Sequence, residues 1–192
     1  MHGSGYWLGE RIGGSRASVW LAVVRGAEGF RLPVILKRAA ADDPEARAEL
    51  RREALIAGLS RHPNIVRVHD LFEDEGELVL AMEYVSGVSV RALPQPVPWH
   101  VAARIVADVA RGLGHAHELR GPDGRPLAIV HRDVSPDNLL VSELGHTLIA
   151  DFGIARSRFV EVTHHAVVKG TRGYLSPEQA RGDLLDARSD VF

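Results

Sequence analysis

The sequence has no cysteine and no long apolar run. Without cysteine the chain can form neither a disulfide nor a thiolate metal site, which fits a reducing compartment. No apolar run approaches the ~18 residues that a membrane helix needs, and the start of the chain lacks the charged and apolar regions of a signal peptide. We therefore expect a cytoplasmic chain with no membrane segment in this piece.

An excess of charge of one sign is also lacking. The 23 basic and 25 acidic residues give a net charge of −2. Such a balance provides no basic field for nucleic acid and no polybasic stretch for a membrane surface. The composition predicts that nucleic acid is not a partner, and charge alone identifies no other one.

The ten histidines show no metal-binding pattern. None falls in an HExxH spacing, which is the usual signature of a helical zinc site. His115 and His117 are two residues apart on a predicted helix, so their side chains point to different faces. We do not expect a zinc site.

The first part of the chain predicts strands followed by a helix. Residues 6–37 alternate short apolar runs with glycine, which is typical of three antiparallel strands. Asp42 and Asp43 precede Pro44, and the next residues are good helix formers, so a capped helix is expected to run to Leu59. At 192 residues and 45% hydrophobic content, the chain can bury a real core.

The rest of the chain becomes helical. Two apolar runs at residues 65–72 and 78–85, separated by an acidic turn, predict a second hairpin. A proline-rich stretch at residues 94–98 interrupts regular structure, and residues 99–119 predict one long helix. A sheet-rich half thus meets a helical half near residue 86, which makes the fold class α+β.

Two short motifs carry the strongest chemical signal. Residues 131–138 read HRDVSPDN, and residues 151–153 read DFG. Asp133 and Asn138 are five residues apart in a constrained loop, and Asp151 comes from a neighbouring turn. One carboxylate for an incoming hydroxyl and two oxygen ligands for Mg²⁺ are what phosphoryl transfer needs. Either tripeptide could arise by chance, but the order and spacing argue against this.

Together the motifs resemble the catalytic domain of eukaryotic-type (Hanks-type) serine/threonine protein kinases, in a bacterial form. The resemblance covers essentially the whole chain. It implies a two-lobed protein-kinase-like fold: an N-lobe at residues 1–85 with a five-stranded antiparallel sheet and one helix, and a helical C-lobe at residues 86–192 that is only partly present. The implied activity is ATP-dependent phosphorylation of serine or threonine in a protein substrate.

The resemblance assigns the catalytic residues. Asp133 is expected to be the catalytic base, and Asn138 and Asp151 are expected to bind Mg²⁺. Lys37, at the end of a strand, is expected to contact the phosphates of ATP and to pair with Glu53 on the following helix. Taken alone, Lys37 and Glu53 would read as solvated charged residues, so this pairing depends on the downstream motifs.

The resemblance also implies a nucleotide site. A glycine-rich loop would cover the phosphates through backbone donors, two aliphatic side chains would enclose the adenine, and a strand end with the following hinge would meet its edge. The alternative for the loop is a plain glycine-rich hairpin. The residues expected at the nucleotide are Ile12, Gly13, Gly14, Val19, Ile35, Lys37, Met82, Glu83, Val85 and Leu140.

Three positions depart from the family pattern. The glycine-rich loop is one residue short and has Ala17 at its third glycine position. Ile35 stands where alanine is usual, which narrows the adenine slot. Ser135 stands where a lysine usually assists the γ-phosphate, so transition-state charge is less neutralised. These departures predict a slower enzyme rather than an unfolded one.

The segment at residues 170–178, GTRGYLSPE, resembles the substrate loop of serine/threonine kinases and disfavours a tyrosine kinase. Thr171 is expected to touch Asp133. In the preceding loop, phosphate on Thr163 would bring about two negative charges opposite Arg132 and order the loop. An unmodified loop is an equal alternative.

Two other functions remain open. A pseudokinase or truncated binding module is one, and a small-molecule phosphotransferase is the other, although such enzymes lack a loop like residues 170–178. The chain stops soon after Asp190, which in the family anchors the catalytic loop, and Glu178 is expected to lack its usual arginine partner. We therefore expect the 192-residue piece to be poorly stable and barely active alone, with a possible regulatory or sensor region beyond residue 192.

Overall fold

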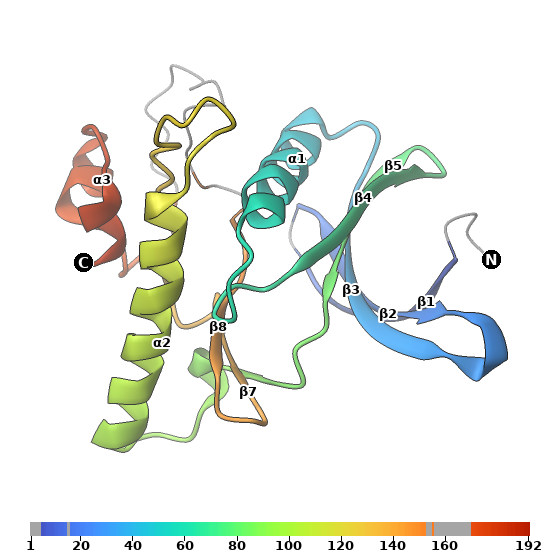
Figure 1. Ribbon diagram of the computed structural model, residues 1–192, viewed down its shortest axis with the longest axis horizontal. Coiled ribbons are helices and arrows are strands. Elements are labelled where there is room, and N and C mark those ends of the chain that lie inside the picture. The colour runs from blue at the N-terminus through green and yellow to red at the C-terminus, as the bar shows by residue number, and fades with distance from the viewer. Residues whose placement is uncertain (1–4, 15, 153–154, 156–169) are drawn as a thin grey trace. The chain divides into compact units, whose positions relative to one another are not determined.

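The computed structural model describes residues 5–14, 16–152, 155 and 170–192. The chain forms two compact units (Figure 1). The first comprises the residues up to Gly58 together with Arg67–Tyr84, and the second comprises Leu59–Val66 and Val85–Phe192. The junction at Tyr84 lies close to the expected lobe boundary, whereas residues 59–66 belong to the second unit.

The first unit is a five-stranded antiparallel sheet with one helix. Its strands lie in the order β1-β2-β3-β5-β4. The predicted α+β fold, with three N-terminal strands, a helix and a second hairpin, is confirmed. The elements are β1 (Tyr6–Gly13), β2 (Ser18–Arg25), β3 (Arg31–Ala39), α1 (Pro44–Leu59), β4 (Val68–Asp74) and β5 (Glu77–Glu83).

Alternation along the strands gives this sheet a packed face. Apolar residues at every second position form a buried cluster, and Tyr6 stacks on Phe72 across it with ring centroids 5.1 Å apart. Because Tyr6 belongs to β1 and Phe72 to β4, this contact links the two edge strands. The cluster consists of Ala22, Val34, Leu36, Val79 and Ala81.

Helix α1 begins where the sequence predicted. The Asp43 carboxylate accepts a hydrogen bond of 2.8 Å from the Ala46 amide, which is the expected N-cap. In the first turn of the helix, Arg47 pairs with Glu73 at 2.6 Å and so links α1 to β4. Its buried residues recur at helical spacing: Ala46, Leu50, Glu53, Ile56 and Ala57.

The second unit combines a long helix with a small sheet that the sequence did not predict. In Figure 1, α2 is the long yellow-green helix, and β7 and β8 lie beside it. The sheet order is β6-β7-β8. The elements are β6 (Gly87–Ser89), α2 (Trp99–Glu118), β7 (Leu139–Ser142), β8 (Thr147–Ile149) and α3 (Pro177–Arg181), with 3-10 turns at Val90–Ala92 and Ala187–Asp190.

The predicted strand at residues 65–72 was partly wrong. Strand β4 begins only at Val68, whereas Ile65 and Val66 are buried and pair with Ile149 of β8. Both residues are apolar, so their pattern could not show which sheet they join. The strand starts late because Ile65 and Val66 pair with the edge of β8, with a bond from the Val66 amide to the Ile149 carbonyl, and not with β5.

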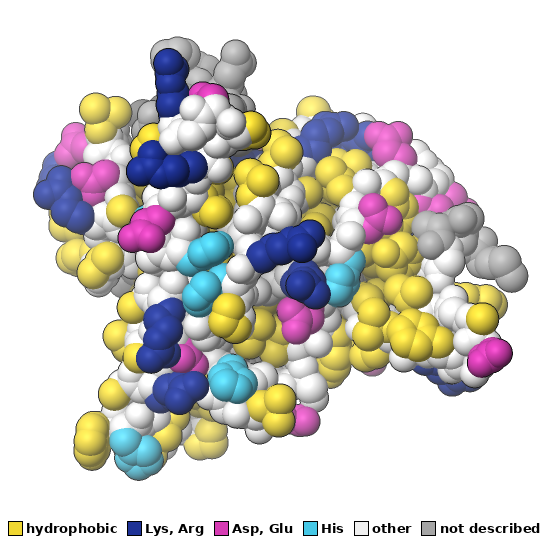
Figure 2. Space-filling model, in the orientation of Figure 1, with side chains coloured by type: hydrophobic (Ala, Val, Ile, Leu, Met, Phe, Trp, Pro, Cys, Tyr) yellow, Lys and Arg dark blue, Asp and Glu magenta, His cyan; other side chains and the backbone are white. Residues whose placement is uncertain are grey.

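Charged side chains are mixed on the face drawn in Figure 2. Basic, acidic and histidine side chains lie among one another there and form no field of a single sign. Within the described residues, no helix combines the length and the apolar composition of a membrane-spanning segment.

His115 and His117 of α2 have separate environments, as predicted. His115 stacks on His62, with ring centroids 5.0 Å apart, while His117 bonds to Asp190. The Asn64 amide donates to Nδ1 of His62 at 3.1 Å. In the described part of the chain, no three His, Cys, Asp or Glu side chains gather into a metal site.

The His62 stack predicts a pH dependence of stability. Partial burial, followed by the charges of His115 and Arg111, lowers the pKa of His62. Below its ordinary pKa of about 6.5, the unfolded chain therefore binds more protons than the folded chain, so stability falls as pH drops through this range. Urea midpoints should decrease from pH 7.5 to pH 5.

The His62→Gln variant should show a smaller decrease in the urea midpoint over that pH range. His69 is exposed on β4, so His69→Gln is the control and should behave as the wild type. An unchanged pH dependence in His62→Gln would refute the assignment. Burial alone would raise the pKa of Asp108, but the bond from the Thr147 amide and the neighbouring arginines outweigh burial and lower it. Its protonation therefore changes stability only at more acidic pH, below about pH 4.

Candidate active site

Lys37 and Glu53 form a buried ion pair in the first unit. Nζ of Lys37 lies 2.7 Å and 2.9 Å from the two carboxylate oxygens of Glu53. The Glu53 side chain is only 3% exposed. Lys37 and the core residues Val34 and Leu36 alternate along β3, so Lys37 lies on the other face of the strand from Leu36, and Glu53 lies on the buried face of α1. The predicted pair is therefore present.

The glycine-rich turn between β1 and β2 is tight. Gly13 pairs with Val19, and Gly14 has a φ of 99°. A Cβ on Gly14 would lie 1.9 Å from the carbonyl oxygen of Ala17, so only glycine fits there. At the tip, Arg16 pairs with Glu45 of α1 at 2.7 Å, a contact that the sequence did not predict.

The other nucleotide residues of this unit lie on neighbouring strands. Ile35 of β3 faces Met82 of β5 directly, so the larger side chain in place of alanine lies beside the expected gatekeeper. Glu83 ends β5, and its amide donates to the Arg67 carbonyl at 2.8 Å. Ile12 is exposed on β1.

In the second unit, Asp133 is held between two hydrogen-bond donors. Nδ2 of Asn138 donates to Oδ2 of Asp133 at 2.9 Å, and the Thr171 amide donates to Oδ1 at 2.7 Å. Asn138 also donates to the Asp133 carbonyl at 2.9 Å, which closes the loop on itself. The predicted contact of Thr171 with Asp133 is present. The carboxylate is partly exposed and thus reachable.

The hairpin of β7 and β8 brings Asp151 to the same end as Asn138. Leu139 pairs with Ile149, and the Ala150 amide donates to the Asn138 carbonyl at 2.9 Å. Asp151 follows at once, with a φ of 66° that turns the chain out of the strand. An amide and a carboxylate at one hairpin end suit Mg²⁺, which takes its other ligands from phosphates and water.

Phe152 and His131 fix this end of the hairpin from inside. Phe152 is fully buried, and its ring meets the His131 ring edge-on at 4.6 Å. Nε2 of His131 lies 3.1 Å from the Ala150 carbonyl. The sequence motifs contained both residues, but only the structure shows that they join the catalytic loop to the turn carrying Asp151.

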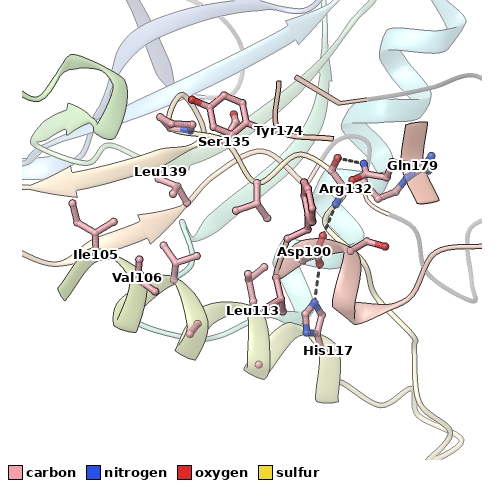
Figure 3. A pocket seen from close by; sticks show the side chains of 18 of the residues that line it. Ile105, Val106, Leu113, His117, Arg132, Ser135, Leu139, Tyr174, Gln179 and Asp190 are labelled. Carbon is pink, nitrogen blue, oxygen red and sulfur yellow. Dashed lines mark hydrogen bonds and ion pairs between the residues drawn. The ribbon is translucent and has the colours of Figure 1, made fainter. Parts of the chain in front are cut away.

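Asp190 anchors the catalytic loop, as the family resemblance implied. Its fully buried carboxylate accepts bonds from the amides of His131 and Arg132, each at 2.8 Å, and lies 2.8 Å from Nε2 of His117. Nε2 of Gln179 donates to the Arg132 carbonyl at 2.7 Å (Figure 3). Arg132 has a φ of 74°, and these bonds hold that strained turn.

Glu178 was expected to lack its usual arginine partner, but its carboxylate is not left without a hydrogen bond. The Ser189 hydroxyl donates to Oε1 of Glu178 at 2.5 Å. This bond is the main cause of a lowered pKa of Glu178. A hydroxyl in the same chain therefore satisfies the carboxylate, and sequence spacing did not reveal it because the two residues belong to different turns.

An apolar cavity of about 530 Å³ lies next to this anchor. Ile105, Val106 and Leu113 of α2 form one side of it (Figure 3). Val191 and Phe192 also line it and are largely exposed.

The remaining sequence-predicted residues are placed as follows. Ser135 is buried, and the Thr171 hydroxyl donates to its hydroxyl at 3.5 Å. Because serine is neutral, this position supplies no positive charge to the catalytic loop. Leu140 lies half-buried on β7 opposite Leu148, and Val85 belongs to the same unit. Thr163 lies outside the described residues.

Comparison with known proteins agrees with this geometry. Residues 6–192 match the family described as protein kinase domain. Over 191 residues the chain is 40% identical to the tyrosine-protein kinase MasK of Myxococcus xanthus, covering 93% of this chain and 29% of that protein. Over 167 residues it is 42% identical to the serine/threonine-protein kinase PknB of Mycobacterium leprae, covering 82% and 26%.

A third relative is the serine/threonine-protein kinase PrkC of Bacillus subtilis, with 36% identity over 184 residues, 94% of this chain and 27% of that protein. The chain thus spans less than a third of the length of these relatives. The matched regions cover 82–94% of this chain. The chain belongs to the protein kinase domain family.

Proposed function

We propose that the chain is the catalytic part of an ATP-dependent kinase that phosphorylates serine or threonine in proteins. The observation that carries the proposal is the Asp133 carboxylate, held by Asn138 and the Thr171 amide yet partly exposed. A carboxylate in this state can accept a proton from a hydroxyl group placed beside it. Two relatives, PknB and PrkC, carry the name serine/threonine-protein kinase.

The reaction would proceed by in-line displacement. The substrate hydroxyl oxygen forms a bond to the γ-phosphorus of ATP, the bond between that phosphorus and the β,γ-bridging oxygen breaks, and ADP leaves. The hydroxyl proton passes to Asp133. The bonds from Asn138 and from the Thr171 amide fix the orientation of the carboxylate that would receive this proton.

The other site residues would bind and orient the nucleotide. Lys37 would contact its phosphates, with Glu53 holding the ammonium in place. Asn138 and Asp151 would hold Mg²⁺, which neutralises phosphate charge when bound. The glycine-rich turn between β1 and β2 would cover the phosphates. The adenine would be bound by side chains and backbone groups of Ile35, Met82, Glu83, Val85 and Leu140.

The metal role of Asp151 predicts a specific loss. In Asp151→Asn the side chain keeps its shape but loses the charge that Mg²⁺ prefers. The thermal stabilisation that ATP gives the wild type in Mg²⁺ should shrink to the value seen without metal. Asp42 is exposed before α1, so Asp42→Asn is the control. A full Mg²⁺ dependence in Asp151→Asn would contradict the role.

A phosphate-transfer assay tests the function itself. The full-length protein that carries this chain is incubated with γ-labelled ATP, Mg²⁺ and matched peptides that differ only in a serine, threonine or tyrosine acceptor. We expect label on serine and threonine. Label on tyrosine alone would favour the second candidate, tyrosine phosphorylation, which the name of the MasK relative raises. Nucleotide binding without any transfer would indicate a pseudokinase.

A cytoplasmic location and a regulatory or sensor region beyond residue 192 stay predictions. The first follows from the need for ATP and from the absence of cysteine in the sequence. The protein substrate is proposed only as a class, a segment with an accessible serine or threonine.

A further inference from the structure

An exposed ion pair lies beside the catalytic loop and has no role in the reaction described above. Arg91 lies in the 3-10 turn after β6, and Asp137 immediately precedes Asn138. Nη2 of Arg91 lies 3.1 Å from Oδ2 of Asp137, and Nε lies 3.4 Å from both oxygens. The two side chains are 51% and 53% exposed, so a substrate can reach them.

The backbone fixes the position of Arg91. Its amide donates to the Pro136 carbonyl at 3.0 Å, next to Asp137. Two residues earlier, Ser89 of β6 pairs with Leu140 of β7. Main-chain pairing at Ser89 and at Arg91 therefore holds the backbone of Arg91 against the loop, next to Asp137.

Tyr174 completes this group, which we call the Arg91 cluster: Arg91, Asp137 and Tyr174. The guanidinium carbon of Arg91 lies 5.6 Å from the centre of the Tyr174 ring. Tyr174 is 41% exposed, and its amide donates to the carbonyl of Thr171 at 3.1 Å. Since the Thr171 amide contacts Asp133, the cluster joins the expected substrate loop to the catalytic loop.

The cluster lies within reach of residues that flank an acceptor hydroxyl at Asp133. Asp137 is adjacent to Asn138, whose side chain bonds to Asp133 at 2.9 Å. Neighbouring Cα atoms are ~3.8 Å apart, and an extended peptide advances ~3.3–3.6 Å per residue. A substrate side chain two or three residues from the acceptor therefore passes close to the cluster.

We propose that Arg91 is a specificity-determining residue: by neutralising Asp137, it makes the enzyme accept substrates that have no basic residue near the serine or threonine. The proposal rests on the proposed function. An exposed carboxylate at this place would by itself attract a substrate lysine or arginine. With the guanidinium of Arg91 already paired to it, that attraction is cancelled, and a basic side chain also meets a like charge.

The test is a double-mutant cycle with four forms of the full-length protein: wild type, Arg91→Ala, Asp137→Ala and the double variant. Matched serine peptides carry arginine, alanine or glutamate at one position from three before to three after the acceptor. The readout is the ratio of kcat/KM for the arginine peptide to that for the glutamate peptide, measured at low salt, where exposed charges act most strongly.

We expect Arg91→Ala to raise this ratio about fivefold at one or more positions, in line with exposed charge pairs. Asp137→Ala should lower it by a similar factor. The double variant should return toward the wild-type ratio, because both charges are then gone. This return distinguishes a charge effect from local unfolding, which would grow worse in the double variant.

Arg181 and Asp183 form a matched control pair, 2.7 Å apart and 63% and 52% exposed on α3 and the residues after it. Arg181→Ala changes the net charge equally and should leave the ratio unchanged. The same ratio in wild type and Arg91→Ala, or an equal shift in Arg181→Ala, would overturn the inference alone. No phosphorylation of any peptide by the wild type would overturn the proposed function and this inference with it.

Discussion

Asp133→Asn is expected to lower kcat by about 10²–10⁴-fold, the range for removal of a positioned acid or base. An amide cannot accept the hydroxyl proton at neutral pH. It also offers only one acceptor oxygen, whereas the native carboxylate accepts from both Asn138 and the Thr171 amide. The orientation of the loop is therefore disturbed together with its chemistry.

The measurement is steady-state phosphorylation of a serine peptide by the full-length protein, together with thermal stabilisation by ATP and Mg²⁺. ATP binding should persist in Asp133→Asn, because the proposed phosphate and metal contacts lie on other residues. Asp123 lies in a surface turn after α2, so Asp123→Asn serves as the control. If kcat of Asp133→Asn stays within a few-fold of the wild type, Asp133 is not the base.

Asp190→Ala is expected to lower the free energy of unfolding by about 3–5 kcal/mol, as removal of one partner from a buried charged network does. The amides of His131 and Arg132 and Nε2 of His117 would lose their acceptor within a buried site. A typical domain is stable by only ~5–15 kcal/mol, so the loss is a large fraction of the total.

Urea unfolding followed by circular dichroism measures this loss. Asp186→Ala is the control, because Asp186 is exposed and pairs with the exposed Arg188 at 2.7 Å. Its urea midpoint should stay much closer to that of the wild type than the midpoint of Asp190→Ala does. Equal midpoints for Asp190→Ala and the wild type would show that the loop is held by other contacts. The same variant should also lose activity, since His131 and Arg132 lead directly to Asp133.

Local patterns predicted what depends on neighbours in the sequence. The strand alternation around Leu36, the cap at Asp43 and the spacing of Asp133, Asn138 and Asp151 all have local signatures. The Lys37–Glu53 pair was predicted only through the family resemblance. Periodicity alone would have left both residues in solvent.

Contacts between distant turns could not be predicted in this way. Asp108 looks like part of the polar face of α2, yet it is buried, and it accepts a bond of 3.1 Å from the Thr147 amide as well as bonds from Arg104 and Arg111. The Ser189–Glu178 bond is of the same kind. Such pairs depend on how turns meet in space, and side-chain type alone does not encode this.

The path of residues 59–66 has a consequence for the order of folding during synthesis. The Val66 amide bonds to Ile149, the Ile149 amide bonds to Asn64, and Nδ2 of Asn64 bonds to Thr147, each at 2.8–2.9 Å. The ribosome makes α1 and all five strands of the first sheet before residue 85, but these bonds need Thr147 and Ile149 of β8, and Thr147 lies 83 residues after Asn64.

The first sheet can therefore pair its strands while residues 59–66, in the middle of its sequence, still lack their partners. Contacts of such long sequence separation form slowly, because a large loop must close before they contribute. Until β8 leaves the ribosome, the apolar side chains of Ile65 and Val66 stay exposed on the nascent chain. That interval is when we expect this chain to depend most on a chaperone that binds short apolar segments.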